Sequence, residues 1–242
     1  MSERTISLFG SGEFLPWAAD VDRHTLERAT AGNGSVVVVP TASAPEGRHI
    51  FDSWGARGIA HYEAMDVPVR VAALIDRKDA FDESVIAQLE GASLIYFSGG
   101  NPAYLADTLR DTPFWDAVRE SLDSGVAVSG CSAGACFMGE IAPDSTQDER
   151  DSKSWYVAGL RLLPGVMIGP HWNALDSWQP GITDFIIQNT PEGDRLVGID
   201  EDTALVGDGT SWKVFGNGAV HIYESGELSG GPFGAGASLS FR

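Results

Sequence analysis

Cysteines and basic residues are scarce in this chain of 242 residues, and each scarcity argues against a class of protein. Only two cysteines are present, which argues against a small secreted scaffold held together by disulfides. The 16 Lys and Arg face 34 Asp and Glu, which gives a formal net charge of -18. A field of that sign repels phosphate backbones and anionic lipid headgroups. The sequence therefore predicts no nucleic-acid partner and no binding to a membrane surface.

Long hydrophobic runs are also missing. No apolar run approaches the roughly 18 residues that a membrane-spanning helix needs. The first ten residues lead directly into a strand-like segment, without the basic and apolar stretches of a secretory leader. Hydrophobic residues nevertheless make up 43% of the chain, which is enough for a substantial core. We expect a cytoplasmic globular protein in which residues 1–242 form a single α/β domain, because no linker or repeat is visible.

Strand-like and helix-like segments alternate through the first two-thirds of the chain. Short β-branched runs predict the strands, and amphipathic stretches between them predict the helices. This alternation favours a doubly wound, mostly parallel sheet, in which ligands bind beyond the carboxyl ends of the strands. The predicted strands cover residues 5–9, 35–39, 67–71, 93–97 and 126–129, and the predicted helices include 50–56, 79–90 and 103–122. Four loops would then meet at one edge of the sheet, at residues 10–14, 41–44, 99–101 and 131–132.

The last third of the chain has a different pattern. From residue 196 onward, β-branched runs are separated by glycine-rich turns. Gly216-Asn217-Gly218 lies between two such runs, 212–215 and 219–223, which predicts a β-hairpin. The glycine-rich residues 229–237 predict a loop before a final strand at 238–241, and the charged stretch 140–153 predicts a surface excursion.

The segment from Gly130 to Gly134 reads Gly-Cys-Ser-Ala-Gly and so matches the pattern Gly-x-Ser-x-Gly. On a sharp turn between a strand and a helix, the serine of this pattern exposes its hydroxyl, and small neighbours let the turn close. The sequence therefore predicts Ser132 as the nucleophile of a hydrolase, against the alternative of a turn built only for packing. Cys131 precedes the apex and should point away from the pocket, and Cys136 is expected to be a small buried hydrophobe.

With Tyr96-Phe97-Ser98-Gly99-Gly100-Asn101 ahead of it, this elbow resembles the peptidase E and cyanophycinase family of serine peptidases. Three further segments are similar to that family. They are the first glycine-rich loop at residues 10–13, a candidate histidine segment at 168–172 and a candidate acid segment at 197–204. The resemblance implies a flavodoxin-like fold related to the class I glutamine amidotransferases.

The resemblance also implies a triad of Ser132, His171 and Glu201, with an oxyanion hole formed by the backbone N–H groups of Gly100 and Ala133. In such a triad the histidine takes the serine proton and later delivers it to the leaving amine, while the acid fixes the histidine tautomer. The residues alone leave the acid open, because carboxylates occupy positions 200 to 202 and Asp200 is the next candidate. This covalent mechanism needs no cofactor.

Substrate preference is where the sequence departs from the family. Peptidase E enzymes cleave after an N-terminal Asp and are expected to hold its carboxylate with an Arg, but residues 162–194 contain no Lys or Arg. The Gly-Pro turn before the histidine also differs from the cyanophycinases. We expect short peptides or related amides as substrates, and a pocket for apolar or basic side chains. Its expected substrate-binding residues are Asn101, Trp172 and Trp178, with Arg150 or Lys153 as candidates for a cationic contact.

Two other functions stay open on the sequence. An α/β-hydrolase esterase has the same elbow but the order Ser, acid, His, which would make His221 the base. A non-catalytic binding protein would keep an amidotransferase-like scaffold without its chemistry. We predict no metal site, because the acidic residues between 144 and 151 have no His or Cys partners, and no phosphate-binding loop is present. The sequence is compatible with a homodimer.

Overall fold

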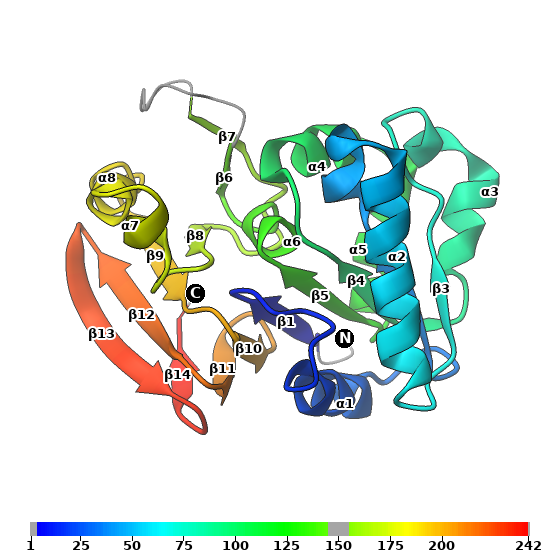
Figure 1. Cartoon of the computed structure of the whole chain (residues 1–242), viewed down its shortest axis with the longest axis horizontal. Coiled ribbons are helices and arrows are strands. Elements are labelled where there is room, and N and C mark those ends of the chain that lie inside the picture. The colour runs from blue at the N-terminus through cyan, green and yellow to red at the C-terminus, as the bar shows by residue number, and fades with distance from the viewer. Residues whose placement is uncertain (1–3, 145–154, 242) are drawn as a thin grey trace.

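The computed structural model describes residues 4–144 and 155–241, and its central feature is a sheet whose first five strands are parallel (Figure 1). These strands are short and apolar, and every residue of β1, β2, β4 and β5 is buried. Their spatial order is β1-β5-β4-β2-β3. The bounds are β1 (Ile6–Phe9), β2 (Ser35–Val39), β3 (Val69–Val71), β4 (Ala92–Phe97) and β5 (Ala127–Cys131).

Antiparallel strands from the C-terminal third extend this sheet beyond β1 and build a second one. The strands β10 (Thr203–Gly207), β11 (Ser211–Gly216) and β14 (Ser238–Ser240) add to the β1 edge in that order. The fold is therefore α/β with a mostly parallel central sheet, as the sequence predicts. The second sheet has the order β13-β12-β9-β8, and β6 pairs with β7. These strands are β6 (Ile141–Pro143), β7 (Tyr156–Ala158), β8 (Val166–Gly169), β9 (Arg195–Ile199), β12 (Ala219–Glu224) and β13 (Glu227–Gly234).

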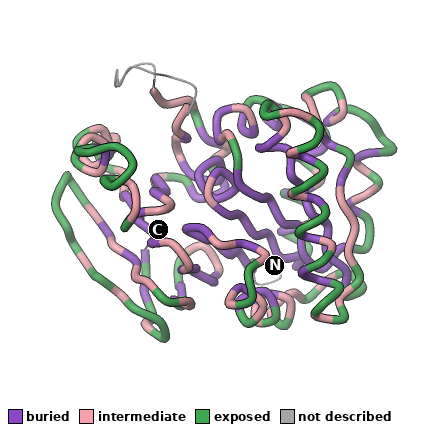
Figure 2. Tube along the Cα trace, in the orientation of Figure 1, coloured by how far each residue is buried: buried purple, intermediate pink, exposed green. Residues whose placement is uncertain are grey.

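Helices cover both faces of the central sheet, and the strands appear as a buried layer between more exposed helices (Figure 2). Side chains alternate across a strand, so Val38 joins the apolar cluster on one face while Val37 and Val39 join the cluster on the other. The first face is covered by α1 (Ala18–Arg28) and α2 (Arg48–Glu63). The second is covered by α4 (Pro102–Leu109), α5 (Pro113–Asp123) and α6 (Ala133–Cys136).

Two helices predicted as continuous are interrupted in the structure. The predicted helix 103–122 is divided into α4 and α5, because Pro113 cannot continue a helix and instead begins the next one. The predicted helix 79–90 is a series of short turns around α3 (Glu83–Ile86). Its cap is Asp82, which accepts the Ser84 N–H at 2.8 Å, and not Asp79.

The hairpin predicted at residues 216–218 is wrong. The strands on either side, β11 and β12, belong to different sheets. The connection is bound to the start of β10, because the Asn217 N–H donates to the Asp202 carbonyl at 2.8 Å and the Gly218 N–H donates to Thr203 Oγ1 at 2.9 Å. The prediction of a loop at 229–237 is also wrong for most of its length, because β13 occupies residues up to Gly234 and forms a hairpin with β12.

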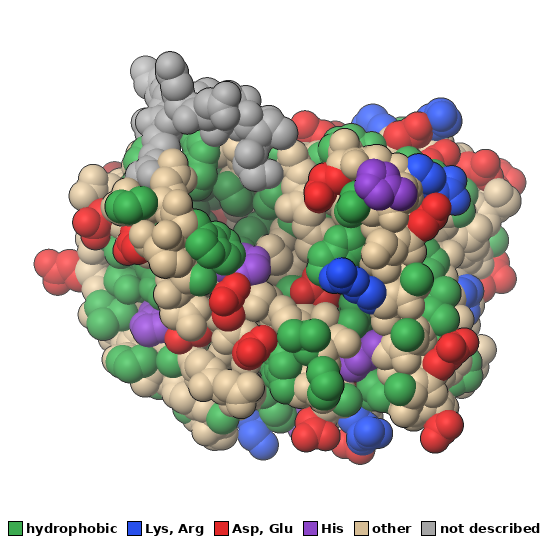
Figure 3. Space-filling view, in the orientation of Figure 1, with side chains coloured by type: hydrophobic (Ala, Val, Ile, Leu, Met, Phe, Trp, Pro, Cys, Tyr) green, Lys and Arg blue, Asp and Glu red, His purple; other side chains and the backbone are tan. Residues whose placement is uncertain are grey.

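Loops at the carboxyl ends of the parallel strands meet at one edge of the central sheet, as the sequence predicts. The Asn101 N–H after β4 donates to the Ala42 carbonyl after β2 at 2.7 Å. The Ser132 N–H after β5 donates to the carbonyl of Phe9, the last residue of β1, at 3.0 Å. Acidic side chains are scattered over the face of the molecule seen in Figure 3. Within residues 4–144 and 155–241, no helix combines the length and hydrophobicity needed to cross a bilayer.

Candidate active site

Ser132 occupies the turn between β5 and α6. Its backbone has φ 52° and ψ −113°, a conformation that side-chain-bearing residues rarely adopt. The turn closes because its flanking positions are glycines. A β-carbon on Gly130 would collide with the Gly134 carbonyl, and one on Gly134 would collide with the Phe97 carbonyl. This is the strained strand-to-helix turn that Gly-x-Ser-x-Gly predicts.

His171 reaches Ser132 from the loop after β8, on the other side of β1. Its Nε2 atom lies 2.9 Å from Ser132 Oγ. The histidine itself has a positive φ of 54°, and its N–H donates to the Gly10 carbonyl at 3.3 Å, which ties its loop to the end of β1. The two residues are 39 positions apart in sequence, so only the folded sheet brings them together.

Glu201 completes the series, from the turn that follows β9. Its Oε1 lies 2.9 Å from His171 Nδ1. Its own N–H donates to Asn173 Oδ1 at 2.9 Å, which ties the acid to the loop of the histidine. Serine hydroxyl, imidazole and carboxylate thus lie in a line of hydrogen-bonding distances, the arrangement that a serine hydrolase triad needs.

Asp200, the competing acid, faces a different histidine. Its side chain is buried, and Oδ1 lies 3.1 Å from His221 Nε2. Its Oδ2 accepts the Ala219 N–H at 2.9 Å. These contacts occupy both oxygens of Asp200 at the start of β12. His221, the base in the esterase alternative, therefore contacts Asp200 and not Ser132.

The proposed oxyanion donors lie on either side of the nucleophile. Gly100 has φ 142°, and a β-carbon there would collide with the Ala42 carbonyl, so only glycine fits. Ala133 is the first residue of α6, where a helix leaves its N–H groups without an internal partner. In the described part of the chain, neither N–H has a protein acceptor. Asn101 caps α4 by accepting the Tyr104 N–H at 2.9 Å, so its side-chain oxygen already has a structural partner.

Glu13 is a site residue whose place the sequence did not reveal, because its pattern suits a pocket wall or a helix start equally well. The carboxylate is buried, with 8% of the residue exposed. Oε1 accepts the Gly99 N–H at 2.9 Å, and Oε2 accepts the Cys131 Sγ–H at 2.8 Å. Burial raises the pKa of the Cys131 thiol well above its usual value, and the charge of Glu13 raises it further. A neutral, buried thiol is a poor nucleophile.

The two tryptophans predicted to bind substrate have opposite environments. Trp178, in α7 (Leu175–Trp178), is 61% exposed, and its ring centroid lies 5.0 Å from that of His171. It lines an apolar pocket of about 180 Å³ beside the histidine. Other lining residues are Trp155, Tyr156, Met167, Leu175, and, from α8 (Ile182–Gln188), Ile182 and Ile186.

Trp172, the other tryptophan predicted to bind substrate, is not among the residues that line this pocket. Only 7% of the residue is exposed, and it belongs to the small apolar cluster that also contains Met167 and Leu196. The indole occupies the space above Gly198, where a β-carbon would lie 2.6 Å from the ring. The absence of a side chain at Gly198 in β9 thus leaves room for the Trp172 ring, which the sequence analysis expected to contact substrate.

The sequence predicts no metal site, and it offers Arg150 or Lys153 for a cationic contact with substrate. Within residues 4–144 and 155–241, no three His, Cys, Asp or Glu side chains converge as metal ligands would. Arg150, Lys153 and the acidic residues 148–151 lie outside the described residues.

Comparison with known proteins identifies the family. The family model of peptidase family S51 matches residues 6–215. The chain belongs to peptidase family S51. It is therefore a serine peptidase of the peptidase E and cyanophycinase group, and the resemblance found in its motifs is confirmed.

Relatives of this S51 peptidase include enzymes of both kinds. It is 28% identical to the cyanophycinase of Trichormus variabilis over 240 residues, which cover 94% of this chain and 76% of that protein. It is 28% identical to the peptidase E of a Nostoc species over 155 residues, which cover 60% of this chain and 61% of that protein. Among solved structures, a peptidase from an acI-B1 actinobacterium superposes with a TM-score of 0.89 at 30% identity, covering 100% of this chain and 99% of that one.

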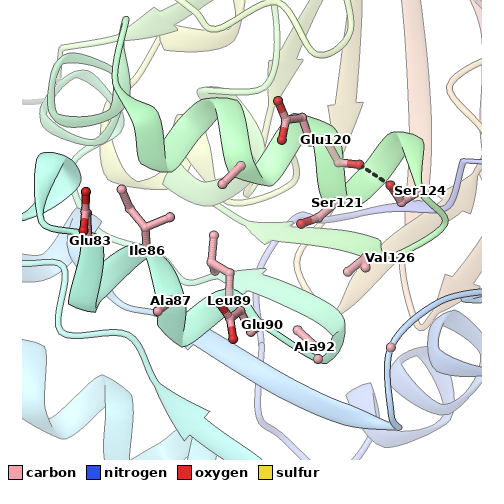
Figure 4. Close-up of a pocket in the computed structure, with 13 residues that line it drawn as sticks. Glu83, Ile86, Ala87, Leu89, Glu90, Ala92, Glu120, Ser121, Ser124 and Val126 are labelled. Carbon is pink, nitrogen blue, oxygen red and sulfur yellow. Dashed lines mark hydrogen bonds between the residues drawn. The ribbon is translucent and has the colours of Figure 1, made fainter.

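A broad hollow elsewhere on this S51 peptidase takes no part in the site. It measures about 500 Å³ and lies between α3 and α5 (Figure 4). Its lining includes Ala92 at the start of β4 and Val126 just before β5, so it opens at the edge of the sheet opposite Ser132. The polar contact drawn in it, from Ser124 Oγ to the Glu120 carbonyl, belongs to the end of α5.

Proposed function

We propose that this S51 peptidase hydrolyses short peptides or related amides through an acyl-enzyme on Ser132. The observation that supports this most directly is the pair of 2.9 Å distances that join Ser132 Oγ to His171 and His171 to Glu201. His171 Nε2 takes the hydroxyl proton as Ser132 Oγ attacks the scissile carbonyl. Glu201 holds the Nδ1 proton and stabilises the imidazolium that results.

The oxyanion of the tetrahedral intermediate is stabilised by the N–H groups of Gly100 and Ala133. Donors fixed before the reaction lower the barrier because they need no reorganisation as charge develops. When the intermediate collapses, the C–N bond breaks and His171 delivers its proton to the leaving amine. Water then enters, His171 removes one of its protons, and attack on the acyl-enzyme releases the acid and restores the Ser132 hydroxyl.

The pocket beside His171 supports an apolar side chain in the substrate. No Asp, Glu, Lys or Arg is among the described residues that line it, and Trp178 offers an exposed aromatic face there. Burying a charged side chain against such walls is unfavourable, whereas burying an apolar one is favourable. This favours an apolar side chain over the basic one that the sequence left open.

The nucleophile is tested with a fluorophosphonate probe followed by mass spectrometry. The proposal predicts one adduct on Ser132 in the native chain and none after Ser132→Ala. Absence of any adduct would favour the non-catalytic binding protein. Separate His171→Ala and His221→Ala variants address the esterase alternative, which requires that the second and not the first abolish turnover.

Profiling with a dipeptide library tests the pocket. We expect the highest kcat/KM for dipeptides that contain an apolar or aromatic residue. A strong preference for Asp at the first position, or for a basic side chain, contradicts the proposed pocket while leaving the proposed triad intact.

A further inference from the structure

We infer that Glu13 is a positioning residue. It fixes the position of the loop that contains Gly99 and Gly100 relative to the turn that carries Ser132. This inference rests on the proposed function, because it assigns a role within the same site. Glu13 lies in the loop after β1, and its two carboxylate oxygens each accept one hydrogen bond from a different catalytic segment. Oε1 is bound to the loop after β4 and Oε2 to the end of β5.

The first segment needs an anchor because it contains two successive glycines. Gly99 and Gly100 have no β-carbon, so their backbone angles are less restricted than those of any other residue type. The N–H of Gly100 is the proposed oxyanion donor, and its direction depends on the two peptide groups around it. Beyond Gly100, the Asn101 N–H is held by the Ala42 carbonyl at 2.7 Å. Before Gly100, the Gly99 N–H is held by Glu13 at 2.9 Å.

The loop is thus held by two hydrogen bonds, one to the Glu13 side chain and one to the Ala42 backbone. Removing the carboxylate leaves the Asn101 contact intact and frees the Gly99 end of the pair. The freed loop lies directly against the nucleophile, since a β-carbon on Gly99 would lie 3.5 Å from Ser132 Cβ and 3.2 Å from Glu13 Oε1. Movement there shifts the oxyanion donor relative to the attacking oxygen.

The second segment is joined to the same carboxylate through Cys131, the residue before Ser132. Cys131 is fully buried, and its Sγ–H donates to Oε2 at 2.8 Å. The main chain of the elbow is held separately, because the Ser132 N–H donates to the Phe9 carbonyl at 3.0 Å. One buried carboxylate therefore couples the strand ends that supply the two oxyanion donors, Gly100 and Ala133. A displacement on the order of 1 Å in such a constellation costs about 100-fold in rate.

The test compares Glu13→Ala with Glu13→Gln and with Glu27→Ala, which removes an exposed carboxylate far from the site. We expect kcat of Glu13→Ala to fall roughly 100-fold with little change in KM, because the lost contact acts in the transition state. The affinity for a peptide aldehyde, which forms a tetrahedral adduct on the serine, should fall by the same factor. Glu13→Gln keeps an oxygen for the Gly99 N–H and should recover most of the rate. Glu27→Ala should match the wild type.

A readout independent of turnover is the hydrogen exchange of the Gly99 amide, followed by NMR. Exchange should accelerate in Glu13→Ala and stay slow in Glu13→Gln. If Glu13→Ala does not fold, Cys131→Ala and Cys131→Ser replace it. Cys131→Ala removes one of the two hydrogen bonds of Glu13 and should lower kcat. Cys131→Ser keeps a hydrogen-bond donor for Glu13 and should leave kcat unchanged.

Three outcomes overturn the inference. They are a kcat for Glu13→Ala within twofold of wild type, a loss confined to KM with unchanged aldehyde affinity, and unchanged Gly99 exchange. If the wild-type chain forms no adduct and hydrolyses no peptide, the proposed function fails instead, and the exchange of Gly99 still decides whether Glu13 holds the loop.

Discussion

Asp200 and Glu201 are neighbours in the chain but bind different histidines. Asp200 turns into the second sheet and meets His221 at 3.1 Å, while Glu201 turns toward the central sheet and meets His171 at 2.9 Å. The division follows from their positions, since Asp200 ends the pairing of β9 with β12 and Glu201 begins the turn into β10. Two chemically similar carboxylates are thereby separated into one structural pair and one candidate catalytic pair.

This pair of acids gives a matched test of the triad. Glu201→Gln should lower kcat by about 10³- to 10⁴-fold, because an amide neither fixes the correct histidine tautomer nor stabilises the imidazolium. Asp200→Asn should keep kcat within a few-fold of wild type and lower thermal stability, because it weakens the buried contact with His221. Peptide hydrolysis and thermal unfolding of both variants measure these effects. Equal losses of kcat in the two would contradict the assignment of Glu201.

Gly100 is expected to tolerate no side chain. Its φ of 142° is strained for any L-residue, and a β-carbon would meet the Ala42 carbonyl. Gly100→Ala should therefore displace the oxyanion donor and reduce kcat by about 10²- to 10³-fold. Gly234→Ala is the control, because Gly234 has open space around it and no positive φ. Steady-state kinetics of the two variants check this, and an active Gly100→Ala enzyme would remove Gly100 from the oxyanion hole.

Trp178 and Trp172 should respond differently to the same substitution. Trp178→Ala removes an exposed ring and should raise KM for apolar dipeptides while leaving the unfolding free energy within about 0.5 kcal/mol. Trp172→Ala empties a buried site and should cost about 3–5 kcal/mol of stability. Urea unfolding and dipeptide kinetics separate the two effects. A normal KM for Trp178→Ala would show that the pocket beside His171 does not bind substrate.

The two thiols should be unreactive in the folded chain. Burial raises the pKa of Cys136 to about 12 and that of Cys131 well above its usual value. A raised pKa keeps a thiol protonated as pH increases, so at pH 8 neither residue carries the reactive thiolate. A disulfide exchange reagent should label neither cysteine natively and both in denaturant. Rapid native labelling of Cys131, with loss of activity, would instead revive a cysteine nucleophile.

The sheet could be predicted from the sequence because its signals are local and redundant. From residue 5 to residue 134, three signals indicate the same alternation of strands and helices. They are the apolar β-branched runs, the amphipathic stretches between them and the glycines after the strands, and together they predict the parallel sheet. The prediction at residues 216–218 was wrong because turn residues indicate a change of direction but not the partner of the next strand. Hydrogen bonds to Asp202 and Thr203 direct β12 into the other sheet.

The chain sequence by itself determined the elbow at Ser132, because the steric demands of that turn are met by glycines within two positions of it. It also indicated His171 and Glu201, but only through their likeness to a known family. Tertiary structure alone decided which carboxylate meets His171, which tryptophan is buried and what Glu13 holds. Those choices depend on contacts between segments up to 118 positions apart, and a linear pattern carries no information about which distant atoms share a site.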